Sequence, residues 1–287
     1  MTNLTPVGIK DFTPEETFTH ENIIRKVETV FKKNNYQKII TPTIDFFETL
    51  NKGLGESLAE KALKFFDHEG NTLILRPDFT TPIARLIATR MKHTPLPIKL
   101  YYSDKIFRNN PKNTHEEIEI FQTGVELVGL NNPESEAEVI ILGIESLFNL
   151  GFQDFGVDIG HLDFIAKLSD QKKEALIKGN YVEFGKIPAI GQEEIIQDFP
   201  HLLKVYDLLV KKGYQKYIRF NKGLIKDINY YTGIIFEFYL KGFGYSIGSG
   251  GRYNNLIKNF GLDLPAIGFS LDINRIIGAK KKLDFNL

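Results

Sequence analysis

The feature that most constrains the fold is a series of strand-like segments with few helices between them. Ile98 to Phe107 and Glu117 to Val128 are rich in apolar and β-branched residues, and a polar segment, 109–115, joins them. Further strand patterns occur at 37–42, 72–76, 155–159, 216–220, 233–240 and 244–248. Parallel neighbours need long crossover connections, usually helical. The short connections therefore predict an α+β fold with an antiparallel sheet flanked by helices, not a doubly wound parallel sheet.

Helical patterns lie between groups of these strands. Thr13 can cap a first helix, with proline and two acids directly after it, because such residues satisfy and complement a helix N-terminus. Thr80 can cap a second helix, and residues 133–150 have helical apolar spacing. Residues 169–212 are polar with a helical pattern. We therefore expect a small helical insertion there.

The composition excludes several kinds of chemistry. Cysteine is absent, which removes disulfides, thiolate nucleophiles and Cys-type zinc sites and favours a cytoplasmic location. The histidines are scattered, and the glycine cluster at 248–252 lacks the end of a phosphate-binding loop. No stretch approaches the ~18 apolar residues of a membrane span. We therefore expect no metal, no cofactor and no membrane partner.

The charge balance bears on nucleic-acid binding. Lysine plus arginine equals aspartate plus glutamate, at 36 each. Proteins that hold a phosphate backbone usually carry a basic excess. The balance therefore weakens any interpretation that includes tRNA as a partner.

Several polar side chains lie where predicted strands end or face one another. The seven candidates for a ligand-binding site are Asp78, Thr80, Arg108, Gln122, Glu126, Tyr230 and Tyr231. Taken singly, each has an ordinary structural explanation: Glu126 fits a solvated strand face, and the tyrosine pair fits a core and its rim. The glycines at 248–251 fit either a tight turn or close strand packing. We expect residues 246–256 to form a turn that enters a helix.

Together, the segments are far more specific. Their order and spacing, from about Gly8 to Ile277, resemble those of histidyl-tRNA synthetases, a class II family with an antiparallel sheet flanked by helices. The segments that carry the resemblance are 75–85, 107–108, 121–126, 229–233, 246–256 and 265–271. The resemblance implies one class II synthetase-like domain over residues 1–287, which includes the insertion.

The resemblance also implies roles for the seven residues. Asp78 and Thr80 match the residues that bind the α-amino group of histidine, and Arg108 matches the arginine near its carboxylate and the α-phosphate. Gln122 matches a glutamine that touches the amino acid. The remaining three, Glu126, Tyr230 and Tyr231, match groups that hold the imidazole.

The chemistry of free histidine fits this set independently. The ligand has an ammonium group, a carboxylate and an imidazole that bears an N–H. An acid pairs with the first, an arginine with the second, and a carboxylate or a phenol with the third.

Departures from the synthetase pattern concern the triphosphate. Glu116 stands near the place of an arginine that would bind the γ-phosphate, and a carboxylate there repels ATP. Lys226 replaces the family's catalytic arginine, and lysine cannot form the planar two-pronged contact of a guanidinium. Asp227 follows it, where the family has glycine, although Arg275 matches the arginine of the third class II motif. The chain also ends soon after Arg275, so we expect no C-terminal anticodon-binding domain.

The retained and lost features together are similar to those of the regulatory subunits of ATP phosphoribosyltransferase, a resemblance that residues 6–15 and 158–161 share. It implies a protein with no catalytic residues of its own, which activates a short-form catalytic subunit and conveys feedback inhibition by free histidine. It also implies a dimer within a hetero-oligomer. The alternative is a truncated synthetase paralogue that adenylates histidine for an acceptor other than tRNA. Arg108 and Arg275 favour this enzyme, whereas Glu116 and Lys226 oppose it.

Overall fold

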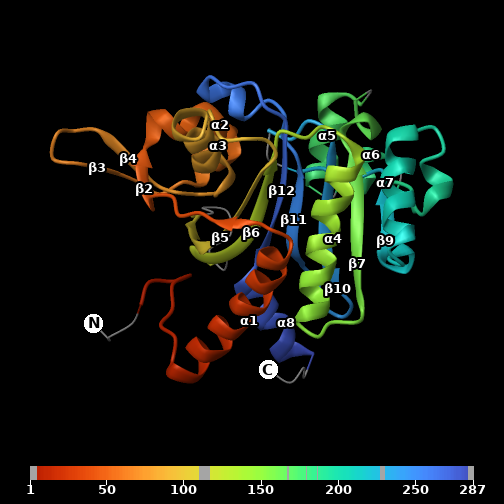
Figure 1. Cartoon of the computed structure of the whole chain (residues 1–287), viewed down its shortest axis with the longest axis horizontal. Coiled ribbons are helices and arrows are strands. Elements are labelled where there is room, and N and C mark those ends of the chain that lie inside the picture. Colours follow the sequence, from red (N-terminus) through yellow and green to blue (C-terminus); the bar gives the residue numbers. More distant parts are fainter. Residues whose placement is uncertain are drawn as a thin grey trace.

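The computed structural model describes residues 5–109, 117–166, 168–178, 180–185, 187–226 and 230–283. Within these ranges the main feature is a nine-stranded sheet (Figure 1). Its strands, in spatial order, are β1 (Gln37–Lys38), β5 (Ile98–Phe107), β6 (Glu119–Val128), β12 (Ala266–Asp272), β11 (Ser246–Arg252), β10 (Ile234–Leu240), β7 (Phe155–His161), β9 (Ile218–Asn221) and β8 (Ile190–Gly191).

The pairing confirms the predicted α+β class and refines the predicted sheet. All neighbours from β5 to β7 are antiparallel, but β1 pairs with β5, and β9 with β7, in the parallel sense. The connection from β7 to β9 contains α5 (Asp170–Ile177), α6 (Tyr181–Phe184) and α7 (Pro200–Lys211). The helices that we predicted at 169–212 thus form much of the crossover that a parallel pair requires.

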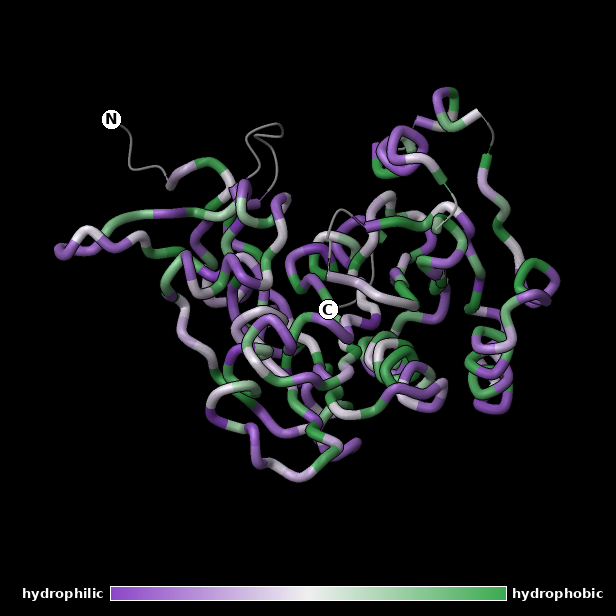
Figure 2. Tube along the Cα trace, turned by 90° about the horizontal axis from the view of Figure 1, so that it is seen from above, coloured by the Kyte–Doolittle hydropathy of each residue, from purple (hydrophilic) through white to green (hydrophobic). Residues whose placement is uncertain are grey.

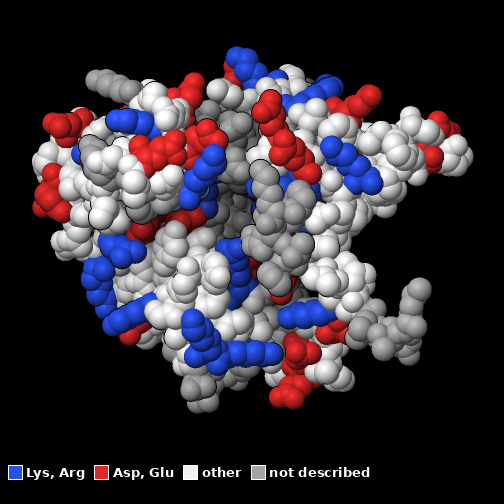
Figure 3. All heavy atoms as spheres, turned by 180° about the vertical axis from the view of Figure 1, so that it is seen from behind, with Lys and Arg blue, Asp and Glu red and all other residues white. Residues whose placement is uncertain are grey.

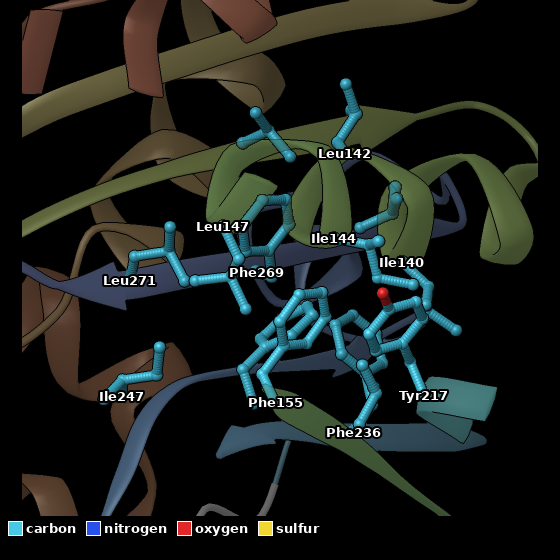
Figure 4. Packing of buried hydrophobic residues seen from close by; sticks show 14 of the residues in the cluster. Ile140, Leu142, Ile144, Leu147, Phe155, Tyr217, Phe236, Ile247, Phe269 and Leu271 are labelled. Atoms are coloured by element: carbon cyan, nitrogen blue, oxygen red, sulfur yellow. The ribbon is translucent and has the colours of Figure 1, made fainter. Parts of the chain in front are cut away.

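Helices cover both faces of the sheet. On one face, α1 (Pro14–Lys33), α4 (Pro133–Asn149) and α8 (Ile273–Lys282) pack on the strands. Figure 4 shows side chains of α4 against aromatic residues of the strands. On the other face, α3 (Thr80–Arg90) packs on β5 in a smaller cluster. A buried Leu, Ile or Phe contributes about 1.5–3 kcal/mol relative to exposure, so these two clusters dominate the stability.

A second, three-stranded sheet projects from the body, as Figures 1 and 2 both show. It consists of β2 (Ile44–Phe46), β4 (Thr72–Leu75) and β3 (Lys64–Phe66), with β4 in the centre. Next to it lies α2 (Phe47–Lys61). The hairpin of β3 and β4 keeps Phe65 and Phe66 exposed. Sequence reasoning did not predict α2, β2 or β3.

Helix starts show one prediction confirmed and one wrong. Thr13 forms a complete capping box at the start of α1, in which its hydroxyl accepts a bond from the Glu16 N–H. Thr80, in contrast, does not cap α3. Its hydroxyl donates to Glu126 at 2.9 Å, while Asp78 accepts bonds from the backbone N–H and the hydroxyl of Thr81. An acid two residues earlier thus takes the expected role of the threonine.

The prediction of a turn that enters a helix at 246–256 is also wrong. Residues 246–252 form β11, and a short 3-10 segment, Ile257–Phe260, follows. The glycines fit because the neighbouring strands lie close: a Cβ at Gly248 would lie 2.6 Å from the Ser270 carbonyl oxygen, and one at Gly251 would lie 2.6 Å from that of Ile234. Of the two explanations for the cluster, the structure therefore shows close strand packing.

Alternation along β6 assigns its residues to the two faces. Val125 and Leu127 belong to the cluster under α1 and α4, whereas Gln122 and Glu126 face a cavity on the other side. This follows from the two-residue period of a strand. Among the described helices, none is long and apolar enough to cross a membrane.

Candidate functional site

A cavity on the face of the sheet opposite α1 and α4 collects the predicted residues. All seven of them line it, together with Phe79, Tyr102, Ser249, Gly250, Gly251, Tyr253, Gly268, Phe269 and Ser270. Its volume is about 60 Å³. At roughly 10–15 Å³ for each water molecule, this space suits a small polar ligand. That the seven residues bind histidine stays a prediction.

Glu126 is the most deeply placed ionisable group of the cavity, with 1% of its surface exposed. Its carboxylate accepts hydrogen bonds from the hydroxyls of Thr80 and Tyr253. Burial nevertheless raises the pKa of Glu126 to about 8, and the negative charge of Asp78 adds to the effect. The group therefore holds a proton near neutral pH until a positive ligand favours its ionised form.

Asp78 is the second buried acid. One of its carboxyl oxygens, Oδ2, accepts two bonds from Thr81, whereas Oδ1 is buried without a hydrogen-bond partner among the described residues. Burial raises the pKa of Asp78 to about 6, although the Thr81 bonds and the charge of Arg108 oppose this. An unpaired buried acceptor costs about 1–3 kcal/mol, so Asp78 is prepared to accept a donor from a ligand.

The segment that holds Asp78 is fixed by Arg76, which is buried. Its guanidinium donates to the carbonyls of Lys105 and Thr41, at 2.8 Å each, and pairs with Asp104 at 2.6 Å. The same group lies 4.3 Å from the ring centre of Phe79, which stacks on Tyr102. These contacts hold the junction of β4 and α3 in one position, which preorganises Asp78 for a ligand.

Four tyrosines, Tyr102, Tyr230, Tyr231 and Tyr253, form the remaining polar wall. Burial raises the pKa of each phenol, so all four keep their protons at neutral pH. A phenol can donate to an imidazole nitrogen or accept from an N–H. The rings of Tyr230 and Tyr231 lie 5.1 Å apart and contact one another at an angle.

The floor of the cavity is backbone, because glycine occupies the facing positions of β11 and β12. A Cβ at Gly268 would overlap the carboxylate of Glu126, and one at Gly251 would lie 2.8 Å from the ring of Tyr231. Any larger residue would displace a cavity wall. Sequence reasoning placed these glycines near the site but did not include them.

Sequence reasoning missed Tyr102 and Tyr253, and the second of them, Tyr253, contacts a predicted residue. Its hydroxyl contacts Glu126 directly, yet in sequence it belongs to the glycine-rich segment that we predicted to turn into a helix. The pairing of Gly268 with Glu126 in the sheet brings Tyr253 next to the carboxyl group of Glu126. Only the correct strand assignment of 246–252 could have revealed this contact.

Two cationic side chains near the cavity, Lys226 and Arg108, are already hydrogen-bonded within the protein. Lys226 donates to Glu237, a buried carboxylate that also accepts from Tyr239. Arg108 donates from Nε to the Pro77 carbonyl oxygen at 2.6 Å, which fixes its guanidinium at the cavity. Glu116 and Asp227, which we expected to weaken ATP binding, lie outside the described residues.

The chain matches known proteins over most of its length. The family model for histidyl-tRNA synthetase matches residues 8–180 and 187–276. A protein of Halothermothrix orenii named ATP phosphoribosyltransferase regulatory subunit is 35% identical over 94% of this chain and 74% of its own length. One of the same name from Clostridium novyi is 34% identical over 96% of this chain and 76% of its own. This chain belongs to the family of ATP phosphoribosyltransferase regulatory subunits, which share the histidyl-tRNA synthetase fold.

Solved structures agree with this assignment. A structure described as an ATP phosphoribosyltransferase regulatory subunit/histidyl-tRNA synthetase from Bacillus halodurans C is similar with a TM-score of 0.88 and 28% identity. The similarity covers 97% of this chain and 83% of that one. Apo histidyl-tRNA synthetase of S. aureus gives a TM-score of 0.75 at 23% identity, over 99% and 72% of the two chains, a likeness of fold.

Proposed function

We propose that this chain is a regulatory subunit without catalytic activity that binds free histidine in the cavity. With histidine bound, it would convey inhibition to a short-form ATP phosphoribosyltransferase catalytic subunit, and without histidine it would activate that partner. The observation that carries the proposal is the pair of buried acids, Asp78 and Glu126, in a small cavity whose polar atoms are only partly satisfied. Two buried carboxyl groups favour a ligand with two positive or donor groups.

The proposed pose uses each polar wall once. The ammonium of histidine donates to Asp78 Oδ1, the buried oxygen without a partner. The ligand carboxylate pairs with Arg108, which lines the cavity, and the imidazole lies between Glu126 and the tyrosines. Charge-assisted bonds of this kind contribute about 1.5–3 kcal/mol each, enough to select histidine over amino acids with an apolar side chain.

The pairing of Lys226 supports regulation over synthesis. Adenylation needs cations that stabilise the charge of a departing pyrophosphate. Lys226 stands where the synthetases have an arginine, but its ammonium is bonded to Glu237. A charge engaged with a buried carboxylate is less able to stabilise a phosphate, and a lysine lacks the planar geometry of arginine.

The rival function is histidine adenylation for an acceptor other than tRNA, and the presence of Arg108 and Arg275 favours it. Histidine-dependent exchange of pyrophosphate into ATP separates the two functions. We expect no exchange above background, with an active histidyl-tRNA synthetase as the positive control. Exchange at a synthetase-like rate would overturn the regulatory proposal.

Reconstitution tests the regulatory role directly. We expect a short-form phosphoribosyltransferase to co-purify with this chain, to lose activity when the chain is absent, and to become histidine-sensitive only when it is present. Glu126→Ala should weaken the histidine response more than the assembly. An unchanged histidine response in that variant would show that inhibition uses another site.

We further propose self-association through the projecting sheet. The strand pairing places the exposed apolar side chains of Ile44, Phe46 and Phe65 on one face of this sheet, and exposed apolar groups that lie together often mark a protein interface. Charges of both signs occur on the face that Figure 3 shows.

A further inference from the structure

A series of hydrogen-bonded polar side chains connects the helical insertion, residues 169–212, to the ligand cavity. It starts at His201 on α7, whose Nε2 lies 2.7 Å from Oε2 of Glu136 on α4. The second oxygen of Glu136 accepts from Nε of Arg252, at the end of β11, at 2.6 Å. Glu136 and Arg252 are 1% and 3% exposed, whereas the side chain of His201 is 45% exposed. These hydrogen bonds thus lead from the surface of the insertion into the interior of the protein.

Arg252 is the last residue of this series, and its backbone contacts two walls of the cavity. Its carbonyl oxygen accepts the N–H of Thr232 at 2.7 Å, and Thr232 directly follows Tyr231. Its own neighbours in β11 and beyond are Gly251, which packs on the Tyr231 ring, and Tyr253, which donates to Glu126. A shift of the Arg252 backbone would therefore move Tyr231 and Tyr253 together.

The guanidinium is held from several sides, which makes it a rigid link. In addition to Glu136, it donates to Ser135 Oγ at 2.9 Å, to the Leu130 carbonyl oxygen at 3.0 Å and to Asn254 Oδ1 at 3.3 Å. Nearly all of these partners lie in or next to α4. Among the described residues, the hydrogen bonds connect this group to the insertion through Glu136 and the imidazole of His201.

We propose that His201 is a positioning residue that couples the insertion to the histidine cavity through Glu136 and Arg252. This inference rests on the proposed function and specifies its regulation. Any partner or ligand that displaces α7 would pull on Glu136, reorient Arg252 and change the spacing of Tyr231 and Tyr253. By reciprocity, histidine in the cavity would change the affinity of the insertion for that partner.

The test compares His201→Ala with His201→Gln and with a matched control, His68→Ala. Glutamine keeps an N–H donor for Glu136, and His68 lies 91% exposed in the turn between β3 and β4. Two properties are measured on the whole chain: the dissociation constant for histidine by calorimetry and the hydrogen-exchange rate of the Thr232 amide. Typical coupling between two sites corresponds to about fivefold or more in affinity.

We expect His201→Ala to weaken histidine binding about fivefold and to speed exchange at Thr232, with recovery in His201→Gln and no change in His68→Ala. Wild-type values of both properties in His201→Ala would overturn the proposal, as would faster exchange throughout β5 and β6, which indicates a general loss of stability. If the wild-type chain does not bind histidine, the proposed function fails, while the exchange rate at Thr232 still decides whether the coupling exists.

Discussion

Replacing Glu126 by glutamine should make the free protein more stable and a poorer binder of histidine. The side chain is fully enclosed and fits against Gly268, and glutamine has nearly the same shape. An amide oxygen can still accept one of the two hydroxyl bonds that Glu126 receives from Thr80 and Tyr253. The substitution therefore changes charge and proton binding while it leaves packing almost intact.

The stability effect follows from the pKa. Burial raises the pKa of Glu126 from 4.5 to about 8, so the folded chain keeps a proton that the unfolded chain loses above pH 4.5. The contribution of this group to stability is therefore full below about pH 4.5 and is lost progressively as the pH rises through about 8. At pH 7 the cost is about 3 kcal/mol, at about 1.4 kcal/mol for each pH unit. Glutamine avoids this cost.

Urea unfolding at pH 5, 6, 7 and 8 measures the effect, with Glu69→Gln as a control because Glu69 is exposed. We expect the stability gain of Glu126→Gln to be small at pH 5 and to grow toward pH 8. Histidine affinity should fall about tenfold or more, since a charge-assisted bond is lost. A stability difference that does not change with pH would refute the assignment of a raised pKa to Glu126.

Three further predictions follow from the cavity and the projecting sheet. Burial raises the pKa of Asp78 to about 6. Histidine binding should therefore weaken about tenfold for each pH unit below 6. Titration calorimetry should show that this pH dependence of the affinity is missing in Asp78→Asn. Gly268→Ala should overlap Glu126, destabilise the fold by about 2 kcal/mol in urea and weaken histidine binding; an unaffected variant would show that the floor is not tight. Phe46→Asp, at a side chain that is 50% exposed, should shift a dimer to monomer in light scattering, and a dimer that persists would exclude this surface.

Local sequence signals predicted the parts of the fold that depend on neighbours in the chain. The capping residue Thr13 and the two long strands β5 and β6 were found because their signals are hydroxyl, proline and apolar patterns within a few residues. The seven candidate residues were found because their motifs keep family order, and the structure places them in one cavity.

Features that depend on distant partners could not be predicted. Thr80 has the chemistry of a capping residue, but Glu126, on another strand, accepts its hydroxyl instead. The glycines of β11 indicated a turn, because the strands that pack against them are not visible in the local pattern. The same reason hid Tyr253 and the pair of Lys226 with Glu237. In each case a tertiary contact overrode a local preference.

Because side chains alternate between the two faces of β6, the number of residues in this strand decides which side chains face the cavity. Deletion of one residue between Gln122 and Glu126 would rotate every later side chain of that strand by half a turn, so Val125 or Leu127 would point at the ligand and the glutamate into the apolar layer under α4. Neighbouring residues can compensate for a point substitution, but they cannot compensate for a one-residue shift in the register of this strand. Natural variation in this strand should therefore consist of replacements and not of length changes.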